Sequence, residues 1–290
     1  MGSISAQHKG DGWENRHMQV AFQGERGAFS ESAVHTFFGP SVDVRPCKNF
    51  SDVFESVENG KAKFGVVPIE NSLEGSVNEA YDLFLEHDLK IRGEIVLRIV
   101  HCLIAHPVTL LNSVKTVYSH PQALAQCRKF LEQLDCRLVP TFDTAGSVKM
   151  IKEEGLMNAG AVASEKAAEM YGMKILANEI EDNSNNYTRF FILSKRDSPY
   201  SGRDKTSIIF SGKNVPGALY HVLEEFAMRN IDLTKIESRP TKQMPWEYNF
   251  YLDFKGHRSE KKCQEALRKI RKKMFFVKVL GSYKAAEGRF

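Results

Sequence analysis

The chain has 290 residues, of which 42% are hydrophobic and 26% charged, with 20 glycines and 10 prolines. These values are ordinary for globular proteins, so they exclude collagen, coiled coil and wholesale disorder, and the length predicts about two domains. Forty Lys and Arg against 36 Asp and Glu give a net charge of +4, too small and scattered to indicate a nucleic-acid partner. No apolar run approaches the roughly 20 residues needed to cross a bilayer, so no membrane partner is expected.

Residues 1–17 contain no apolar segment, so the sequence predicts a disordered tail there and not a signal peptide. The cysteines are odd in number, widely spaced and without a CxxC pair, which disfavours a disulfide framework and a zinc site. We therefore expect reduced thiols, a cytoplasmic location and no metal.

Short apolar runs alternate with amphipathic stretches from Met18 to about Lys195. The expected strands are 19–22, 42–46, 64–69, 114–118, 137–141, 161–163 and 189–193, with further strand-like segments before Ile104. The expected helices are 28–38, 50–59, 76–86, 121–134, 144–154 and 164–171. Strands that alternate with helices of these lengths predict an α/β domain with a parallel or mixed sheet.

Residues 194–205 are polar and carry Ser, Pro and Gly, which is typical of a linker. A compact unit is expected after it. Its elements are strand 206–210, helix 216–229, strands 233–237 and 248–254, helix 260–273 and strand 275–280. This order, βαββαβ, is the ferredoxin-like arrangement.

Two polar segments follow early strands. Gly24–Ser30 (GERGAFS) opens a helix, where glycine amides can approach an anion or form a plain tight turn. Glu70, Asn71 and Ser72 end the most apolar strand, and open α/β sheets bind ligands beyond the carboxyl ends of their strands. The alternative for these three residues is a solvated loop before a helix capped by Ser76.

A third segment, Ser119-His120-Pro121, also follows a strand. Ser119 can cap the helix that Pro121 starts, and Gln122 and Gln126 share one face of that helix. A neutral polar face at a helix start can bind an anionic ligand. His120 is either an acid or base, or a structural residue beside the proline.

The fourth segment reads NNYTRF and enters the last strand of the first region. Thr188 offers a hydroxyl donor, and Arg189 offers a cation that can hold a carboxylate with two hydrogen bonds. A turn leading into a strand is the alternative.

In order and spacing, GERGAFS, PIENSLEGS, SHPQALAQC, DTAGS and NNYTRF resemble the catalytic domain of prephenate dehydratase. Gly217–Leu219 and Glu237–Pro240 are similar to the GALV and ESRP phenylalanine-binding motifs of that family's ACT regulatory domain, with Tyr220 in place of Val. The resemblance covers Met18–Tyr283. Neither a chorismate mutase segment nor a dehydrogenase fingerprint occurs in it, so the chain resembles the monofunctional form.

The resemblance implies a catalytic domain of two α/β subdomains with a cleft between them, similar to type 2 periplasmic binding proteins, followed by a ferredoxin-like ACT domain. The expected organisation is a tail at 1–17, a catalytic domain at 18–195, a linker at 196–204 and an ACT domain at 205–290.

The implied activity is a carbon–oxygen lyase reaction that converts prephenate to phenylpyruvate, water and carbon dioxide in L-phenylalanine biosynthesis. L-Phenylalanine is the expected allosteric inhibitor, and a homodimer or homotetramer is expected because ACT units pair symmetrically. Aromatisation of the ring drives the reaction, so no cofactor is expected. Two alternatives stay open: an arogenate dehydratase, which acts on the amino analogue of prephenate, and a non-catalytic amino-acid sensor.

The motifs also imply site residues. Thr188 is expected beside the leaving hydroxyl as a hydrogen-bond donor, with Glu70 or a water as the proton source. The expected catalytic set is Thr188, Glu70, Asn71, Ser119 and Gln126. The expected substrate-binding set is Gly27, Ser30, Ser72, Thr144, Arg189 and Phe190. The expected L-phenylalanine set is Asn214, Gly217, Ala218, Leu219, Glu237, Ser238, Arg239 and Pro240.

Overall fold

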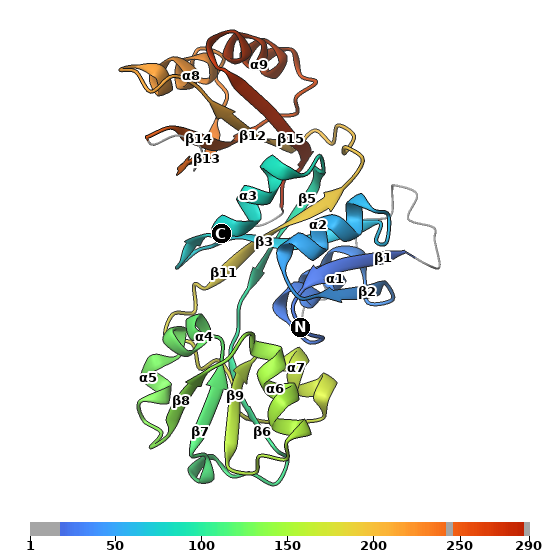
Figure 1. The fold of residues 1–290 in the computed structure, drawn as a ribbon, viewed down its shortest axis with the longest axis vertical. Helices are drawn as coiled ribbons and strands as arrows, with labels where there is room; N and C mark the ends of the chain where they lie inside the picture. The colour runs from blue at the N-terminus through green and yellow to red at the C-terminus, as the bar shows by residue number, and fades with distance from the viewer. Residues whose placement is uncertain (1–17, 242–245, 287–290) are drawn as a thin grey trace. The chain divides into compact units, whose positions relative to one another are not determined.

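The computed structural model describes residues 18–241 and 246–286, so the expected tail at residues 1–17 lies outside the described chain (Figure 1). The described residues divide into two compact units. Unit 1 holds the residues up to Leu83 together with Val96–Phe190. Unit 2 holds Phe84–Ile95 together with the residues from Phe191 onward.

The first sheet is mixed and has the strand order β2-β1-β3-β11-β5, with the short β4 paired to β3. Its core strands are apolar: Val20, Phe22 and Val66 are fully buried. The strands are β1 (Gln19–Gln23), β2 (Asp43–Cys47), β3 (Phe64–Asn71), β4 (Gly75–Ser76), β5 (Lys90–Arg98) and β11 (Tyr187–Ser194). The helices between them are α1 (Phe29–Phe38), α2 (Phe50–Glu58) and α3 (Asn78–Glu86).

The second sheet lies within unit 1 and has the order β10-β6-β9-β7-β8. Helices α4 and α5 lie on one side of it and α6 and α7 on the other (Figure 1). The strands are β6 (Cys102–Ala105), β7 (Thr116–Ser119), β8 (Arg137–Pro140), β9 (Ala159–Ala163) and β10 (Lys174–Ala177). The helices are α4 (Pro121–Gln126), α5 (Arg128–Leu131), α6 (Thr144–Glu153) and α7 (Glu165–Tyr171), with a 3-10 turn at Leu111–Ser113.

The single helix predicted over 121–134 is wrong, because it breaks at Cys127 into α4 and α5. The amide of Asp182 donates to the carbonyl of Gln126 at 2.7 Å, and the Asp182 carboxylate accepts from the amide of Lys129 at 3.0 Å. A residue more than fifty positions away therefore ends one helix and caps the next. Local sequence carries no sign of such a cap.

Other predicted elements are confirmed with shifted ends, and two strands, β4 and β10, were missed. Strand β10 pairs antiparallel with β6 and was not predicted. Ser76 lies in β4, where it pairs with Glu70 of β3, and α3 begins two residues later. Helix α2 begins at Phe50 as predicted, and Asn49 caps it by accepting from the amide of Asp52 at 2.8 Å.

Unit 2 contains a four-stranded antiparallel sheet of order β13-β14-β12-β15, which confirms the βαββαβ order. Helices α8 and α9 lie side by side over one face of this sheet (Figure 1). Phe226, Phe254 and Ile270 are fully buried between the helices and the sheet. The elements are β12 (Asp204–Ser211), α8 (Ala218–Ala227), β13 (Leu233–Pro240), β14 (Tyr248–Lys255), α9 (Lys261–Lys273) and β15 (Phe276–Lys284).

Unit 2 also holds the segment that leads into β5. Lys278 Nζ on β15 donates to the carbonyls of Phe84 and His87, both at 2.8 Å. Lys205 Nζ on β12 lies 2.8 Å from the carboxylate of Glu94, a fully buried side chain of β5. Polar contacts thus bind this segment to the four-stranded sheet. Across residues 18–241 and 246–286, no helix has the length and apolar character needed to span a membrane.

Candidate active site

The end of β3 and the start of β11 share one side-chain amide. Asn71 Nδ2 lies 2.8 Å from Asn186 Oδ1, 3.0 Å from Thr188 Oγ1 and 3.2 Å from the Tyr187 carbonyl. Asn71 Oδ1 accepts from two backbone amides of the following turn, which identifies the nitrogen end of this amide. Because Thr188 Oγ1 accepts from Asn71, the Thr188 hydroxyl hydrogen can point to a further acceptor.

The same chain of hydrogen bonds reaches α4 of the second sheet. Asn186 Nδ2 donates to Gln126 Oε1 at 2.9 Å, and His101 Nε2 lies 3.0 Å from the same oxygen. Asn186 is fully buried and His101 is 2% exposed. Three of the expected catalytic residues, Thr188, Asn71 and Gln126, are therefore joined through one buried asparagine that the motif analysis did not select.

Glu70 and Arg189, the chain neighbours of Asn71 and Thr188, form an ion pair. Arg189 Nη1 lies 3.7 Å from Glu70 Oε2, and the two side chains are 11% and 35% exposed.

Ser72 links the turn after β3 to the start of β11. Its hydroxyl donates to the Asn185 carbonyl at 2.7 Å and accepts from the Tyr187 amide at 2.9 Å. These two bonds, together with the Ser72 amide on the Tyr187 carbonyl at 2.8 Å, hold the start of β11 against the turn after β3. Ser72 therefore orders the backbone that carries Thr188.

Ser119 is fully buried at the end of β7, and its hydroxyl donates to the Val162 carbonyl of β9 at 2.6 Å. The expectation that it caps α4 is wrong, because its oxygen faces β9. The cap is His120, whose Nδ1 accepts from the Gln122 amide at 3.3 Å. This bond gives His120 a structural position at the helix start.

The two remaining expected hydroxyls are not engaged. Ser30 lies in the first turn of α1 and is 6% exposed, and Thr144 is the half-buried first residue of α6. Neither side chain makes a hydrogen bond to any residue in the described part of the chain. Phe190, in contrast, is 1% exposed and lies in the core of the first sheet.

The glycine turn holds an internal anion. The Gly27 amide donates to Glu31 Oε2 at 2.6 Å, and Arg26 Nε lies 2.9 Å from Glu31 Oε1. The Gly27 amide is therefore bonded to the buried Glu31 carboxylate, and the expected role of Gly27 in substrate binding stays a prediction. Gly27 has a φ of +88°, and a Cβ there would lie 2.8 Å from Ala167 Cα, so glycine allows this close packing.

The turn also connects the two sheets of unit 1. Ser164 Oγ donates to the Gly27 carbonyl at 2.6 Å, Tyr171 Oη donates to the Arg26 carbonyl at 3.0 Å, and Lys149 Nζ lies 3.2 Å from Glu25. Residues of α6 and α7 thus contact the turn that precedes α1.

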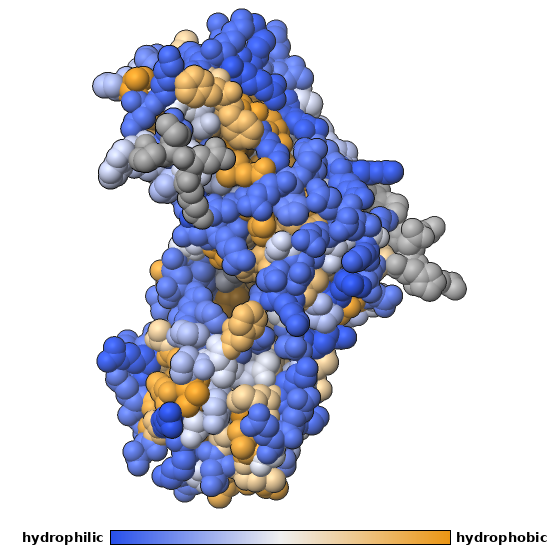
Figure 2. Space-filling view, viewed as in Figure 1, coloured by the Kyte–Doolittle hydropathy of each residue, from blue (hydrophilic) through white to orange (hydrophobic). Residues whose placement is uncertain are grey.

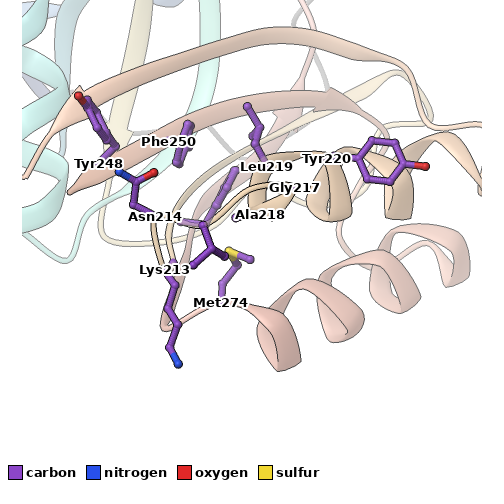
Figure 3. A pocket seen from close by; sticks show the side chains of 12 residues that line it. Lys213, Asn214, Gly217, Ala218, Leu219, Tyr220, Tyr248, Phe250 and Met274 are labelled. Carbon is purple, nitrogen blue, oxygen red and sulfur yellow. The ribbon is translucent and has the colours of Figure 1, made fainter. Parts of the chain in front are cut away.

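Unit 2 contains a cavity of about 260 Å³ at the start of α8 (Figure 3). Four of the eight residues expected to bind L-phenylalanine line it: Asn214, Gly217, Ala218 and Leu219. The other four, Glu237–Pro240, lie on β13 and do not line it. In the space-filling view, hydrophobic side chains gather over α8 and the four-stranded sheet (Figure 2).

Comparison with known families identifies both regions. The family model described as prephenate dehydratase matches residues 20–198, and the ACT domain model matches residues 206–272. The chain belongs to the prephenate dehydratase family. Its α/β catalytic domain is followed by an ACT domain, as the sequence predicted.

Two curated relatives of this prephenate dehydratase family member differ in the activities that their names give. The bifunctional chorismate mutase/prephenate dehydratase of Aquifex aeolicus is 45% identical over 273 residues, covering 93% of this chain and 75% of the relative. The chloroplastic arogenate dehydratase/prephenate dehydratase 2 of Arabidopsis thaliana is 44% identical over 277 residues, covering 92% of this chain and 72% of the relative.

Two solved structures are similar over 92% of this chain, each with a TM-score of 0.85. One is the prephenate dehydratase of Arthrobacter aurescens in complex with L-Phe, at 32% identity and with 90% of that chain covered. The other is GqqA, described as a quorum-quenching acylase, at 34% identity and with 98% of that chain covered.

The residues that join the motifs of this family member through hydrogen bonds were not among the predicted site residues. Asn186 stands inside NNYTRF, two positions before the selected Thr188, and Glu31 follows the selected Ser30. For both residues, the only signal in the sequence was a polar side chain close to a predicted site residue. His101 had no such signal, because only the pairing of β6 with β9 and the contact with α4 bring it to Gln126.

Burial lowers the pKa of His101 from its ordinary 6.5, although the hydrogen bond to Gln126 and the charge of Glu181 oppose the shift. Because the folded pKa is below the unfolded one, His101 stabilises the fold fully above pH ~6.5, and this contribution is lost as the pH falls through the folded pKa.

We expect the unfolding free energy of wild type, minus that of His101→Gln, to shrink as the pH falls from about 7.5 to about 5.5. Urea unfolding at each pH measures this difference, and subtraction removes the groups that both proteins share. A difference that stayed constant across the range would contradict the expectation.

Proposed function

We propose that this chain is a prephenate dehydratase. It catalyses the decarboxylating dehydration of prephenate to phenylpyruvate, in the biosynthesis of L-phenylalanine. The single observation that carries the proposal is the hydrogen-bond chain from Thr188 through Asn71 and Asn186 to Gln126. It offers neutral donors, and we assign the positive charge that an anionic substrate requires to Arg189.

The reaction needs positioning and one donated proton. The bond between the ring and its carboxylate breaks, its electron pair enters the ring, and the hydroxyl group on the opposite ring carbon leaves as water after accepting a proton. Holding the substrate in a reactive geometry can lower such a barrier by as much as ~7–11 kcal/mol. A donor aimed at the departing hydroxyl adds about 3–4 kcal/mol.

In this proposal Thr188 is the donor to the departing hydroxyl. Its oxygen accepts from Asn71, which leaves the Thr188 hydrogen for the substrate. A water beside Glu70 supplies the proton, because the Glu70 carboxylate itself is paired with Arg189. Arg189 and the amide NH₂ of Gln126 hold carboxylates, and Ser30 and Thr144 offer two further hydroxyls. Ser119, Ser72 and Phe190 support the backbone around the site.

We propose residues 18–195 as the catalytic domain, 196–204 as the linker and 205–290 as a regulatory domain inhibited by L-phenylalanine. The cavity at the start of α8 supports this assignment, as does the relative solved in complex with L-Phe. We also propose a cytoplasmic location, which agrees with five free cysteines, four of them buried.

A homodimer or homotetramer is the proposed assembly. Strand β13 lies at the edge of the four-stranded sheet, and no residue in it is fully buried. A second copy pairing along β13 would cover this edge and bring Glu237–Pro240 to an interface, where these residues can complete an L-phenylalanine site.

Leu219→Ala should raise the L-phenylalanine concentration for half-inhibition by about five- to tenfold, because the ligand ring loses an apolar contact worth about 1–1.4 kcal/mol. Inhibition curves on purified protein measure this, with the rate of the same variant without L-phenylalanine as reference. Met228→Ala is the matched control, since Met228 is 73% exposed just after the same helix. Equal curves for Leu219→Ala and wild type would remove Leu219 from the site.

Competition between prephenate and arogenate tests the proposed function. The two substrates differ by a keto or an ammonium group on the side chain. We expect turnover of prephenate with release of phenylpyruvate, and comparison of kcat/KM decides between it and the alternative, arogenate dehydratase. Turnover of neither substrate would refute both enzymatic readings and favour a non-catalytic amino-acid sensor.

A further inference from the structure

His101 occupies a buried position that the proposed chemistry has not used. It lies just before β6 and is 2% exposed. Its backbone is fixed on both sides, because its amide donates to Glu181 Oε2 at 3.0 Å and its carbonyl accepts from the Ile180 amide at 3.0 Å. Its ring stands edge-on to Phe29, with the ring centres 5.4 Å apart and the planes at 86°. The imidazole therefore has little freedom to rotate.

The hydrogen bond of this ring defines its protonation state. His101 Nε2 lies 3.0 Å from Gln126 Oε1, and that oxygen already accepts from Asn186 Nδ2 at 2.9 Å. An amide oxygen only accepts, so Nε2 carries a hydrogen, and burial lowers the pKa of the ring, so that the neutral form has none on Nδ1. Nδ1 is buried and has no hydrogen-bond partner among the described residues. An apolar ring would fill the same space without burying an unpaired nitrogen, so the histidine is not explained by packing.

Two N–H donors on Gln126 Oε1 fix the orientation of the amide. Turning the amide by 180° would place its NH₂ group against the donors of His101 and Asn186 and would break both bonds. The NH₂ of Gln126 is thereby held away from these two residues. Gln126 is half-buried, so its NH₂ can meet a ligand from that side.

We propose that His101 is a positioning residue that fixes the side-chain amide of Gln126, so that its NH₂ group is presented to a carboxylate of the substrate. The inference rests on the proposed function, because it assigns Gln126 to substrate binding. His101 itself does not touch the substrate. It acts through the hydrogen bond from Nε2 to Gln126 Oε1.

Two amide substitutions test the two ring nitrogens of His101 individually. In His101→Gln the side-chain N–H takes roughly the position of Nε2, whereas in His101→Asn it takes that of Nδ1. We expect His101→Asn to raise the KM for the turned-over substrate by about five- to tenfold, with kcat changed by less than about threefold. His101→Gln should restore the KM to within about twofold of wild type. His101→Phe, an apolar ring without a donor, should behave like His101→Asn.

A double-mutant cycle with Gln126→Ala tests whether His101 acts through Gln126. Once the amide is removed, His101→Asn should change the KM by less than about twofold further. A loss of the same size in both backgrounds would show a purely structural role and overturn the inference. So would an unchanged KM in His101→Asn, or a KM in His101→Gln as high as in His101→Asn.

Thermal unfolding of every variant accompanies the kinetics. If neither His101→Asn nor His101→Phe folded while His101→Gln did, the residue would be structural and the inference would fail. A wild-type protein that turned over neither prephenate nor arogenate would refute the proposed function and, with it, this inference. An active wild type with insensitive His101 variants would refute the inference alone.

Discussion

Thr188→Ala should lower kcat by about 10²–10³ and leave the fold intact. The Thr188 oxygen accepts from Asn71 Nδ2 at 3.0 Å, so its hydrogen is directed to another acceptor. In the proposed reaction that acceptor is the departing hydroxyl, whose charge develops only as the carbon–oxygen bond breaks. A bond that forms in the transition state affects kcat more than KM. Steady-state kinetics with prephenate measure both constants.

Two further substitutions control for the shape of the Thr188 side chain. Thr188→Val keeps the branched shape without the hydroxyl and should lose as much as Thr188→Ala. Thr188→Ser keeps the hydroxyl and should retain kcat to within about fivefold. Thr188 is 9% exposed, so circular dichroism should accompany the kinetics to show that each variant is folded. An unchanged kcat in Thr188→Val would remove this residue from the chemical step.

Gln126→Ala should raise KM by about 10- to 100-fold and change kcat much less. A hydrogen bond to a charged group contributes about 1.5–3 kcal/mol, which is the size of this effect. The amide binds a carboxylate equally in the ground state and the transition state, so its loss weakens binding without slowing the chemical step. Substrate-saturation curves and a direct binding measurement should therefore agree.

The matched control for this prediction is Gln122→Ala on the same helix. Gln122 uses its backbone amide to bind His120, and that bond survives the substitution. We expect its KM to stay within about threefold of wild type. A drop confined to kcat in Gln126→Ala would instead place Gln126 in the chemical step.

Much of the site was readable because it lies at strand ends, where function and local pattern coincide. Asn71 and Thr188 follow or enter apolar strands, and polar residues at such ends predict a ligand site at the sheet edge. The elements of the ACT domain could be predicted for a similar reason. The spacing of its hydrophobic residues changes clearly between the two-residue period of strands and the longer period of helices.

The errors share one physical cause, which is that polar groups choose partners in space and not along the chain. The amide of Gly27 bonds to the buried carboxylate of Glu31, a residue that no motif had singled out. Ser119 was expected to cap α4, but its hydroxyl donates to the carbonyl of Val162 on a neighbouring strand. The helix over 121–134 breaks because Asp182 competes for the carbonyl of Gln126.

Periodicity and ordered motifs in the chain sufficed for the fold class, the order of the two domains and the family. The spacing of hydrophobic residues along a short stretch of chain predicts helices and strands, because folding buries these residues. These properties could therefore be predicted without the tertiary structure. The links among Asn71, Asn186, Gln126 and His101 follow only from folding, because they join residues up to 115 positions apart. Hydrogen bonds between residues so far apart in the sequence depend on where the two sheets place the ends of their strands. No local stretch of sequence determines that placement.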